Sequence, residues 1–304
     1  MTHKFNRISH LHFISLVGLF TSQVGMTAEV PEKLAFAFQK QKDPRSIQEH
    51  AERVAEILGD RIGIPVEVRV PTSYGATVQA LISNRAHVAY VDSISFLLAR
   101  SEAPVRLILV ELRDGRTEYD SIFVVRKDSP LQNLAELRGK RMMFTSNTST
   151  SGYVMAYSRL VNEGLLEKEQ DPEEFFDEVG FAGGYDRALL AVLRGQADAC
   201  AVSAYTMEGL KADIYLDAEQ RDQLRVLTRT PGVPTHLICL RADLPEDLQE
   251  KIKASLLAIS KDHPELLADV YGASEFVEAD QDEHVAKTVE ALKNTGLGPK
   301  GLVK

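Results

Sequence analysis

The residues best suited to chemistry are the hydroxyl side chains of segment 147–152, which reads Asn-Thr-Ser-Thr-Ser-Gly. The segment follows a short predicted strand, 140–144, and leads into a helical pattern that begins at Tyr153. Its hydroxyl groups should therefore lie beside the free backbone N–H groups of a helix start, and such donors together favour binding of a small oxyanion. Ser and Thr are also ordinary helix N-caps, so the motif alone leaves both roles open.

The rest of the chain offers little catalytic chemistry. It has no His/Cys/Asp cluster at metal-ligand spacing, no Gly-x-Ser-x-Gly elbow and no phosphate-binding Gly-Lys-Ser/Thr loop. Asp, Glu and His are present but scattered. We therefore expect a protein that holds an anion without transforming it, with no cofactor and no metal. An enzyme on the same scaffold is the less favoured alternative.

Residues 1–28 have the pattern of a secretory signal peptide. Lys4 and Arg7 form a basic start, an apolar run extends over 11–20, and small and polar residues lead to Ala28. The apolar run is too short to span a bilayer. These features predict a soluble exported protein, most simply a periplasmic one. A buried N-terminal helix is the alternative.

The charge of the chain limits its partners. Removal of a signal peptide carrying Lys4 and Arg7 would take the formal net charge from −9 to −11. An acidic protein of this kind is a poor nucleic-acid binder, so we expect no nucleic-acid partner. Any anionic ligand must then be held by nearby hydrogen-bond donors, which have to overcome repulsion from the net negative charge of the protein.

The two cysteines, Cys200 and Cys239, each lie inside an apolar, strand-like run. A disulfide would be permitted in an oxidising compartment, and two buried thiols fit the pattern equally well. Neither cysteine has the neighbours of a metal site or a catalytic thiol.

Apolar strand patterns alternate with helical patterns along the first half of the mature chain. This alternation predicts an α/β fold in which a largely parallel sheet is covered by helices on both faces. The expected strands are 33–38, 65–70, 87–91 and 105–112, and the expected helices are 46–58, 74–83 and 94–100.

Two similar strands, 121–127 and 236–240, flank an α/β region of about a hundred residues, and a Pro-Gly-Val-Pro break at 231–234 precedes the second. A chain that leaves one lobe, builds another and returns makes two hinge crossings, and ligands favour the cleft between such lobes. We expect lobe 1 to comprise 29–122 plus 236–304, and lobe 2 to comprise 123–235. One continuous domain is the alternative.

These segments in this order resemble the type II periplasmic solute-binding proteins, and most closely the phosphonate-, phosphite- and phosphate-binding components of ABC transporters. The resemblance covers most of the mature chain and implies two lobes, each a mostly parallel sheet flanked by helices, joined by two hinge crossings. Its most specific element is the Ser-Thr-Ser-Gly block. The segments that carry it are 71–75, 87–90, 124–130, 149–152 and 191–198.

The resemblance implies particular ligand contacts. Ser149, Thr150 and Ser151 would be direct donors, and Tyr74 and Tyr119 would close on the ligand from the other lobe. Hydroxyl and backbone N–H donors suit a tetrahedral oxyanion, which offers several acceptor lone pairs. The two tyrosines have a second interpretation, because aromatic residues at such junctions also pack lobe interfaces.

The chain departs from the family pattern at several positions. Tyr185 stands where the family usually has a histidine, and it cannot carry a positive charge. Tyr205 and His236 stand where aminoalkylphosphonate binders use acidic residues, which disfavours an amine-bearing ligand; His236 is either a ligand contact or a hinge residue bonded to backbone. Ser93 could donate to the ligand, whereas Asp92 would repel an anion unless it caps the next helix.

The resemblance and the residues together predict a monomeric periplasmic receptor that captures a phosphonate-like oxyanion and presents it to the membrane permease of an ABC transporter. The alternative is a sensor with the same fold, whose partner would be the periplasmic domain of a histidine kinase.

Overall fold

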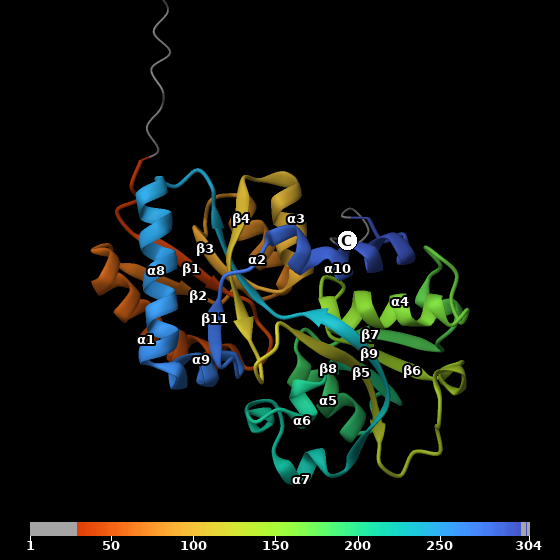
Figure 1. Cartoon of the computed structure of the whole chain (residues 1–304). Helices are drawn as coiled ribbons and strands as arrows, with labels where there is room; N and C mark the ends of the chain where they lie inside the picture. The colour runs from red at the N-terminus through yellow and green to blue at the C-terminus, as the bar shows by residue number, and fades with distance from the viewer. Residues whose placement is uncertain (1–28, 299–301, 303–304) are drawn as a thin grey trace, which may run out of the picture.

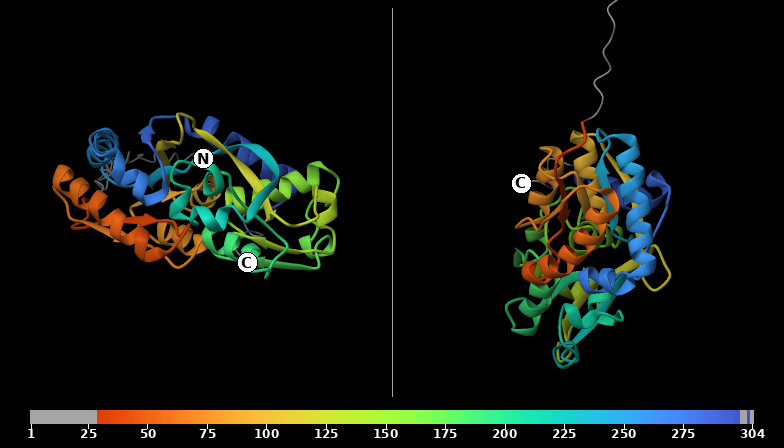
Figure 2. Two further views of the ribbon diagram at one scale, coloured as in Figure 1. Left: turned by 90° about the horizontal axis from the view of Figure 1, so that it is seen from below. Right: turned by 90° about the vertical axis from the view of Figure 1, so that its left-hand side faces the viewer.

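The computed structural model describes residues 29–298 and Leu302. They form two β-sheets of six and five strands, each flanked by helices (Figure 1). The sheets lie in two lobes, with α1 (Pro44–Ile62) at one end of an elongated molecule and α4 (Met155–Asn162) towards the other (Figure 2). The predicted α/β, two-lobed architecture is confirmed. The predicted signal peptide, 1–28, lies outside the described residues.

The first sheet has the strand order β11-β4-β10-β3-β1-β2. All residues of β1 (Leu34–Phe38) are buried because helices cover both faces of the sheet. Phe36 packs in the same cluster as α1, whereas the adjacent Ala37 packs with α2, as the two-residue repeat of a strand requires. The other elements are β2 (Val66–Arg69), α2 (Tyr74–Ile82), β3 (Val88–Val91), α3 (Ser93–Glu102), β4 (Val105–Leu112), β10 (Leu237–Arg241), α8 (Glu246–Asp262), α9 (Pro264–Tyr271) and β11 (Glu275–Val277).

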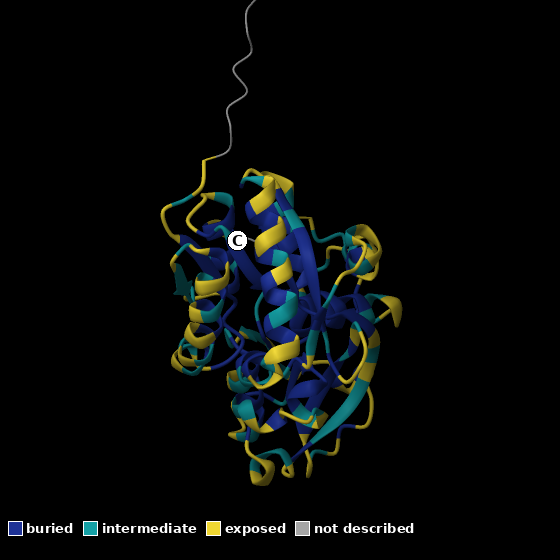
Figure 3. Ribbon diagram, turned by 60° about the vertical axis from the view of Figure 1, so that its left-hand side comes forward, coloured by how far each residue is buried: buried dark blue, intermediate teal, exposed yellow. Residues whose placement is uncertain are grey.

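The second sheet has the order β7-β6-β8-β5-β9. Its central strand, β8 (Ala199–Ser203), is buried along its whole length. Figure 3 shows the same division in both lobes, with buried strands inside and helices whose outer faces are exposed. The remaining elements are β5 (Glu118–Arg126), η1 (Leu134–Leu137), β6 (Arg141–Phe144), η2 (Thr150–Val154), η3 (Pro172–Glu174), β7 (Glu178–Phe181), α5 (Tyr185–Leu193), α6 (Tyr205–Glu208), η4 (Ala212–Ile214), α7 (Ala218–Arg221), β9 (Leu224–Pro234) and α10 (Gln281–Thr295).

Both sheets are mixed, so the prediction that each is mostly parallel is wrong in this detail. β1 runs parallel to β2 and β3, and β6 runs parallel to β7 and β8. β10 is antiparallel to β3 and β4, β11 to β4, and β5 to β8 and β9. Parallel strands need a crossover connection such as a helix. β5 and β10 arrive instead from the other lobe, and no helix sets their direction.

The predicted break at 231–234 is also wrong, because these residues complete β9. β9 is an edge strand that pairs with β5 and has no further neighbour among the described strands. Proline lacks the N–H that an interior strand must donate, and an edge strand tolerates that loss. Pro231 and Pro234 therefore lie inside a strand that the sequence pattern concealed.

The chain passes between the sheets after β4 and again between β9 and β10, and the second sheet already begins at Glu118. The lobe boundaries at 122 and 235 stay a prediction. The pairing of Glu118 with Pro234 places the first passage a few residues before position 122. α10 makes a third passage beyond the two that were predicted. It packs against α4 and β9 of the second lobe as well as α3 and β4 of the first (Figure 1).

The hydroxyl segment folds into a five-residue π-helical turn, η2, that leads directly into α4. π-turns occur frequently at functional sites. The turn folds back on the end of β6, where Thr145 N donates to Gly152 O at 3.2 Å. A Cβ atom at position 152 would overlap the Thr145 side chain, so only glycine fits this turn.

Replacing Gly152 by alanine should therefore disturb the turn. We expect Gly152→Ala to lower the free energy of unfolding by about 2 kcal/mol, because overpacking of a buried site typically costs this much. The control is Gly75→Ala in α2, where a Cβ would meet nothing within 4 Å and alanine is the better helix former. Urea unfolding checks both, and equal stability of the two variants would contradict the close packing of the turn.

Candidate ligand-binding site

The three hydroxyl residues of the turn are fully buried, and each already has a protein partner. Ser149 Oγ accepts from Gly152 N at 3.1 Å, and Thr150 Oγ1 accepts from Ile94 N at 3.1 Å. Ser151 Oγ lies 3.0 Å from the Tyr185 hydroxyl and 2.7 Å from Ser203 Oγ. A hydroxyl that accepts still has its own proton to donate. Capping and ligand binding are therefore compatible at Ser149 and Thr150.

Asp92 lies at the start of α3 and reaches the turn from the other lobe. Its Oδ1 accepts from Ser95 N at 2.9 Å, which is an N-cap, and its Oδ2 accepts from Thr150 N at 2.8 Å. Asp92 therefore caps α3, which is one of the two roles that the sequence left open for it. The carboxylate also takes one of the amide donors that the sequence assigned to an external anion.

Tyrosine side chains of the second lobe gather near the turn. The Tyr119 and Tyr205 rings are 5.0 Å apart, and the Tyr185 and Tyr205 rings are 6.1 Å apart. Burial, followed by the proximity of Tyr185, raises the pKa of Tyr74, Tyr119 and Tyr205 well above its ordinary value. These phenols stay neutral at physiological pH and can act as hydrogen-bond donors.

His236 is held by a buried carboxylate. Its Nδ1 lies 3.4 Å from Glu111 Oε1, and that same oxygen accepts from Arg113 Nη2 at 3.0 Å. Burial alone would raise the pKa of Glu111, but Arg113, followed by His236 and Tyr90, holds that pKa at about 2. The His236 ring stacks at 6.1 Å from Tyr119, and its Nε2 has no partner among the described residues.

The segment 39–42, directly after β1, is a part of the site that the sequence analysis missed. Gln39 Oε1 accepts from Asp92 N at 2.8 Å, and Gln41 Oε1 accepts from the Tyr205 hydroxyl at 3.2 Å. Gln41 O also accepts from Tyr185 N at 2.9 Å, across the two lobes. The position of this segment could have indicated its role, because ligands bind at the carboxyl ends of strands in α/β sheets.

Every predicted contact residue is buried at the junction between the lobes, and their role as ligand contacts stays a prediction. What marks the junction is a set of buried polar atoms that have no hydrogen-bond partner among the described residues. Such atoms are rare in folded proteins and need an explanation. The set includes Gln39 Nε2, Gln41 Nε2, Tyr74 OH, Ser93 Oγ, Tyr119 OH and His236 Nε2.

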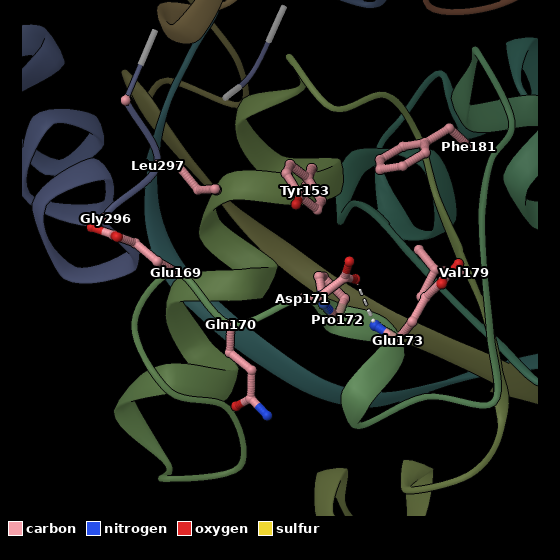
Figure 4. A pocket seen from close by; sticks show the side chains of 11 residues that line it. Tyr153, Glu169, Gln170, Asp171, Pro172, Glu173, Val179, Phe181, Gly296 and Leu297 are labelled. Carbon is pink, nitrogen blue, oxygen red and sulfur yellow. Dashed lines mark hydrogen bonds between the residues drawn. The ribbon is translucent and has the colours of Figure 1, made fainter. Parts of the chain in front are cut away.

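A separate cavity of about 670 Å³ lies beside η3 in the second lobe (Figure 4). Tyr153 and Phe181 line it together with the carboxylates of Glu169, Asp171 and Glu173. Burial, followed by Asp171, raises the pKa of Tyr153 to about 12. These carboxylates would repel an anion, so this cavity does not suit an oxyanion.

The described residues contain no group of three His, Cys, Asp or Glu side chains placed to hold a metal ion. Within 29–298, no helix has the length and apolar character needed to cross a bilayer. Cys200 and Cys239 are both buried free thiols. Of the two alternatives that the sequence left open, a disulfide or two buried thiols, the structure has the thiols. Burial raises the pKa of each thiol, which makes both unreactive.

Residues 36–284 match the protein family described as "ABC transporter, phosphonate, periplasmic substrate-binding protein". The chain belongs to this family. It is 25% identical over 251 residues to the phosphonates-binding periplasmic protein of Escherichia coli K12, covering 81% of this chain and 72% of that protein. The family resemblance expected from the sequence is confirmed.

Two further similarities bear on fold and function. The structure of PhnD1 from Prochlorococcus marinus in complex with methylphosphonate superimposes with a TM-score of 0.76 at 20% identity, covering 88% of this chain and 99% of that one. This confirms the two-lobed fold. The tetrathionate sensor histidine kinase TtrS of Salmonella typhimurium is 27% identical over 193 residues, which are 59% of this chain and 30% of that protein.

The Glu111 network makes a prediction about acid stability. Because the folded pKa of Glu111 lies below its ordinary value of 4.5, its contribution to stability is full above about pH 4.5 and is lost as the pH falls towards 2. Glu111→Gln should remove this part of the pH dependence. It should also lower the free energy of unfolding at neutral pH by about 3–5 kcal/mol, because Arg113 is left buried and unpaired.

Urea unfolding at several pH values between about 2 and 7 measures both the pH dependence of stability and the loss of stability at neutral pH. The control is Glu49→Gln on the exposed side of α1, which should leave the profile unchanged. Identical pH profiles for wild type and Glu111→Gln would show that the network adds no stability.

Proposed function

We propose that this protein is the periplasmic receptor of an ABC transporter and captures a small phosphonate-like oxyanion, namely a phosphonate, phosphite or phosphate. The observation that carries the proposal is the set of buried, unpartnered donors at the junction between the lobes, in a chain of the phosphonate-binding family. Closure of two lobes around a ligand is how such two-domain receptors work.

The donors suit a tetrahedral anion. Tyr74, Ser93 and Tyr119 approach from the first lobe and the first hinge strand, and Ser149 and Ser151 lie on the turn of the second lobe. Hydrogen bonds to a charged acceptor contribute about 1.5–3 kcal/mol each. Five of them would support micromolar or tighter binding after the cost of ordering.

The ligand should carry a short substituent. Tyr205 and His236 replace the acidic residues that hold an ammonium group in aminoalkylphosphonate binders, and both are buried. The Arg113 guanidinium lies 3.8 Å from the centre of the Tyr205 ring, and the ring also contacts Tyr119 and Tyr185. Because the Tyr205 ring is packed against these side chains, we expect little room beside it for an aminoalkyl tail.

The proposal extends to location and partners. The family is periplasmic, and a cleaved signal peptide over residues 1–28 would account for export. The membrane permease of the transporter would recognise the closed form of a monomeric receptor. The chain's own residues provide binding, and we assign no catalytic step to them.

A second candidate function is sensing. The similarity to the sensor kinase TtrS favours it, and the periplasmic domain of a kinase would then replace the permease as partner. The two functions share the same ligand capture. Co-purification from membranes with a permease or with a kinase separates them.

Calorimetric titration of the mature protein tests the ligand class. Phosphate, phosphite or methylphosphonate should bind with micromolar or tighter affinity, and an amino acid or sugar should not. Ser149→Ala combined with Ser151→Ala should weaken binding at least about tenfold, because two donors to the anion are lost.

The control for the serine variant is Ser158→Ala, a buried position on α4 away from the turn. It should leave the affinity unchanged. Reduced stability of the double variant with unchanged affinity would show that the hydroxyls only cap the helix.

Tyr205→Ala should widen the ligand range, because it removes the ring that fills the tail space. We expect propylphosphonate to gain at least tenfold in affinity relative to methylphosphonate. Tyr205→Phe, which keeps the volume and loses the bond to Gln41, should keep the wild-type preference. If Tyr205→Ala kept the wild-type preference between propylphosphonate and methylphosphonate, the alkyl tail of the ligand would not lie beside Tyr205.

A further inference from the structure

The cavity beside η3 has walls whose chemistry the oxyanion site does not explain. It encloses about 670 Å³ between the segment 169–173, strand β7 and the residues that follow α10 (Figure 4). Small-molecule sites typically have volumes of about 300–1,000 Å³. The cavity is lined by two aromatic rings and three carboxylates, and no Lys, Arg or His is among its described lining residues. The charge that these residues present is therefore negative.

The three carboxylates of the cavity, Glu169, Asp171 and Glu173, are unpaired. Among the ion pairs that the described residues form, none includes any of them, although Lys168 also packs close to Gly296. Asp171 accepts a hydrogen bond from Glu173 N at 3.0 Å, and the other two side chains accept none from the described part of the chain. All three residues are exposed, so salt screens their charges but the protein does not neutralise them.

Tyr153 provides an independent sign that the cavity holds a ligand. Its side chain is only 7% exposed, yet its hydroxyl group forms no hydrogen bond with a described residue. Figure 4 shows the hydroxyl oxygen on the side of the ring that faces the Asp171 carboxylate. The phenol stays neutral, because burial, followed by Asp171, raises its pKa to about 12. A buried hydroxyl group without a partner needs an explanation, and a molecule bound in the cavity supplies one.

The two aromatic rings form a corner that suits a cation. The centres of the Tyr153 and Phe181 rings are 5.3 Å apart, and their planes meet at 71°. Phe181 is 48% exposed, which is unusual among the large apolar residues of the described chain. The cation–π contacts of the described residues involve other rings, so the protein places no Lys or Arg here. Aromatic faces attract ammonium groups, and the walls thus favour the same charge as the carboxylates do.

The arrangement of the carboxylates does not suit a metal ion. Ca²⁺ and Mg²⁺ need several oxygen ligands around one point. No three His, Cys, Asp or Glu side chains among the described residues are placed in that way. Carboxylates that are spread over a cavity match a cation whose charges are also spread. The apolar segments between those charges would lie against the rings and Leu297.

We propose that this cavity is a second ligand site, separate from the cleft between the lobes, and that it binds a small aliphatic polyamine. The ammonium groups of the polyamine pair with the three carboxylates, and its alkyl chain lies on the rings of Tyr153 and Phe181. The proposal goes beyond oxyanion capture and does not depend on it. The two sites are neighbours, because Tyr153 belongs to η2, the turn that carries the proposed oxyanion donors.

Calorimetric titration of the mature protein with spermidine at neutral pH and low ionic strength tests the proposal. We expect a dissociation constant of about 100 μM or tighter, and we expect it to weaken as NaCl is added, because exposed charges are screened. Propylamine, which has one ammonium group, should bind about tenfold more weakly or worse. MgCl₂ should displace spermidine no better than NaCl of the same ionic strength, and selective displacement by Mg²⁺ would overturn the proposal.

Variants of the cavity wall locate the site. The triple variant Glu169→Gln, Asp171→Asn and Glu173→Gln should lose about tenfold or more in spermidine affinity, and its asparagine keeps the N-cap of η3. Phe181→Ala, at a half-exposed position that tolerates truncation, should weaken binding about threefold because a cation–π contact is lost. Unchanged affinity in both variants would place spermidine elsewhere.

The matched control removes the same charge far from the cavity. Glu49→Gln, Glu52→Gln and Glu56→Gln change three exposed carboxylates of α1, in the other lobe. This variant should bind spermidine as wild type does. Equal losses in the two triple variants would show that net charge alone attracts the polyamine, and no site would remain.

Competition separates this cavity from the cleft between the lobes. Methylphosphonate should not displace spermidine, and displacement would place the polyamine in the cleft and overturn the proposal. Failure of wild type to bind spermidine would also overturn it and leave oxyanion capture intact. Failure of every phosphorus oxyanion to bind would instead overturn the proposed function and leave the polyamine site standing.

Discussion

Two helices begin face to face across the junction between the lobes, and burial makes their free amide groups costly to leave unpaired. Asp92 meets this constraint with one side chain, because its two oxygens accept from Ser95 N and Thr150 N. Thr150 completes the exchange by accepting from Ile94 N. The starts of α3 and η2, which belong to different lobes, are thereby held together.

A second buried carboxylate organises the hinge in the same manner. Glu111, at the end of β4, bonds to Arg113 and Tyr90 and lies beside His236, which follows the returning strand β9. Arg113 in turn donates to the backbone of α9 at Tyr271 O and lies over the Tyr205 ring. The Tyr205 ring and the His236 imidazole are thus positioned by the buried ion pair of Glu111 and Arg113.

In this acidic protein, buried donors without a partner in the described part of the chain gather at the junction between the lobes. Its free donors are phenols, a serine hydroxyl and glutamine amides, all preorganised by packing. The C-terminal helix α10 adds a constraint on lobe motion. His284 Nε2 donates to Thr235 O at 2.9 Å beside the second passage, and burial lowers the pKa of that imidazole so that it stays neutral. Because α10 packs on both lobes, any movement of one lobe relative to the other must also shift or bend this helix.

Local patterns in the chain were enough to identify the elements whose structure is set by nearby residues. The strand 105–112 was predicted with its observed bounds, and the hydroxyl turn and most of the helices were placed correctly, because apolar spacing and capping residues act over a few positions. The family followed from short motifs of the same kind. What depended on distant residues was missed: the direction of β5 and β10, the proline-containing edge strand β9, and the passage of α10 to the second lobe.

The same distinction between nearby and distant residues applies to the candidate site. Ser149, Thr150, Ser151 and the tyrosines could be named from residue type and position. The role of Gln39 and Gln41, the network around Glu111, and the bond from Asp92 to an amide 58 positions along the chain could not. Hydrogen bonds and burial of this kind depend on which surfaces the two lobes bring together, and only the folded chain decides that. Residue type and spacing thus identified the hydroxyl groups and the tyrosines, whereas only the approach of the two lobes placed the Asp92 carboxylate against the hydroxyl turn.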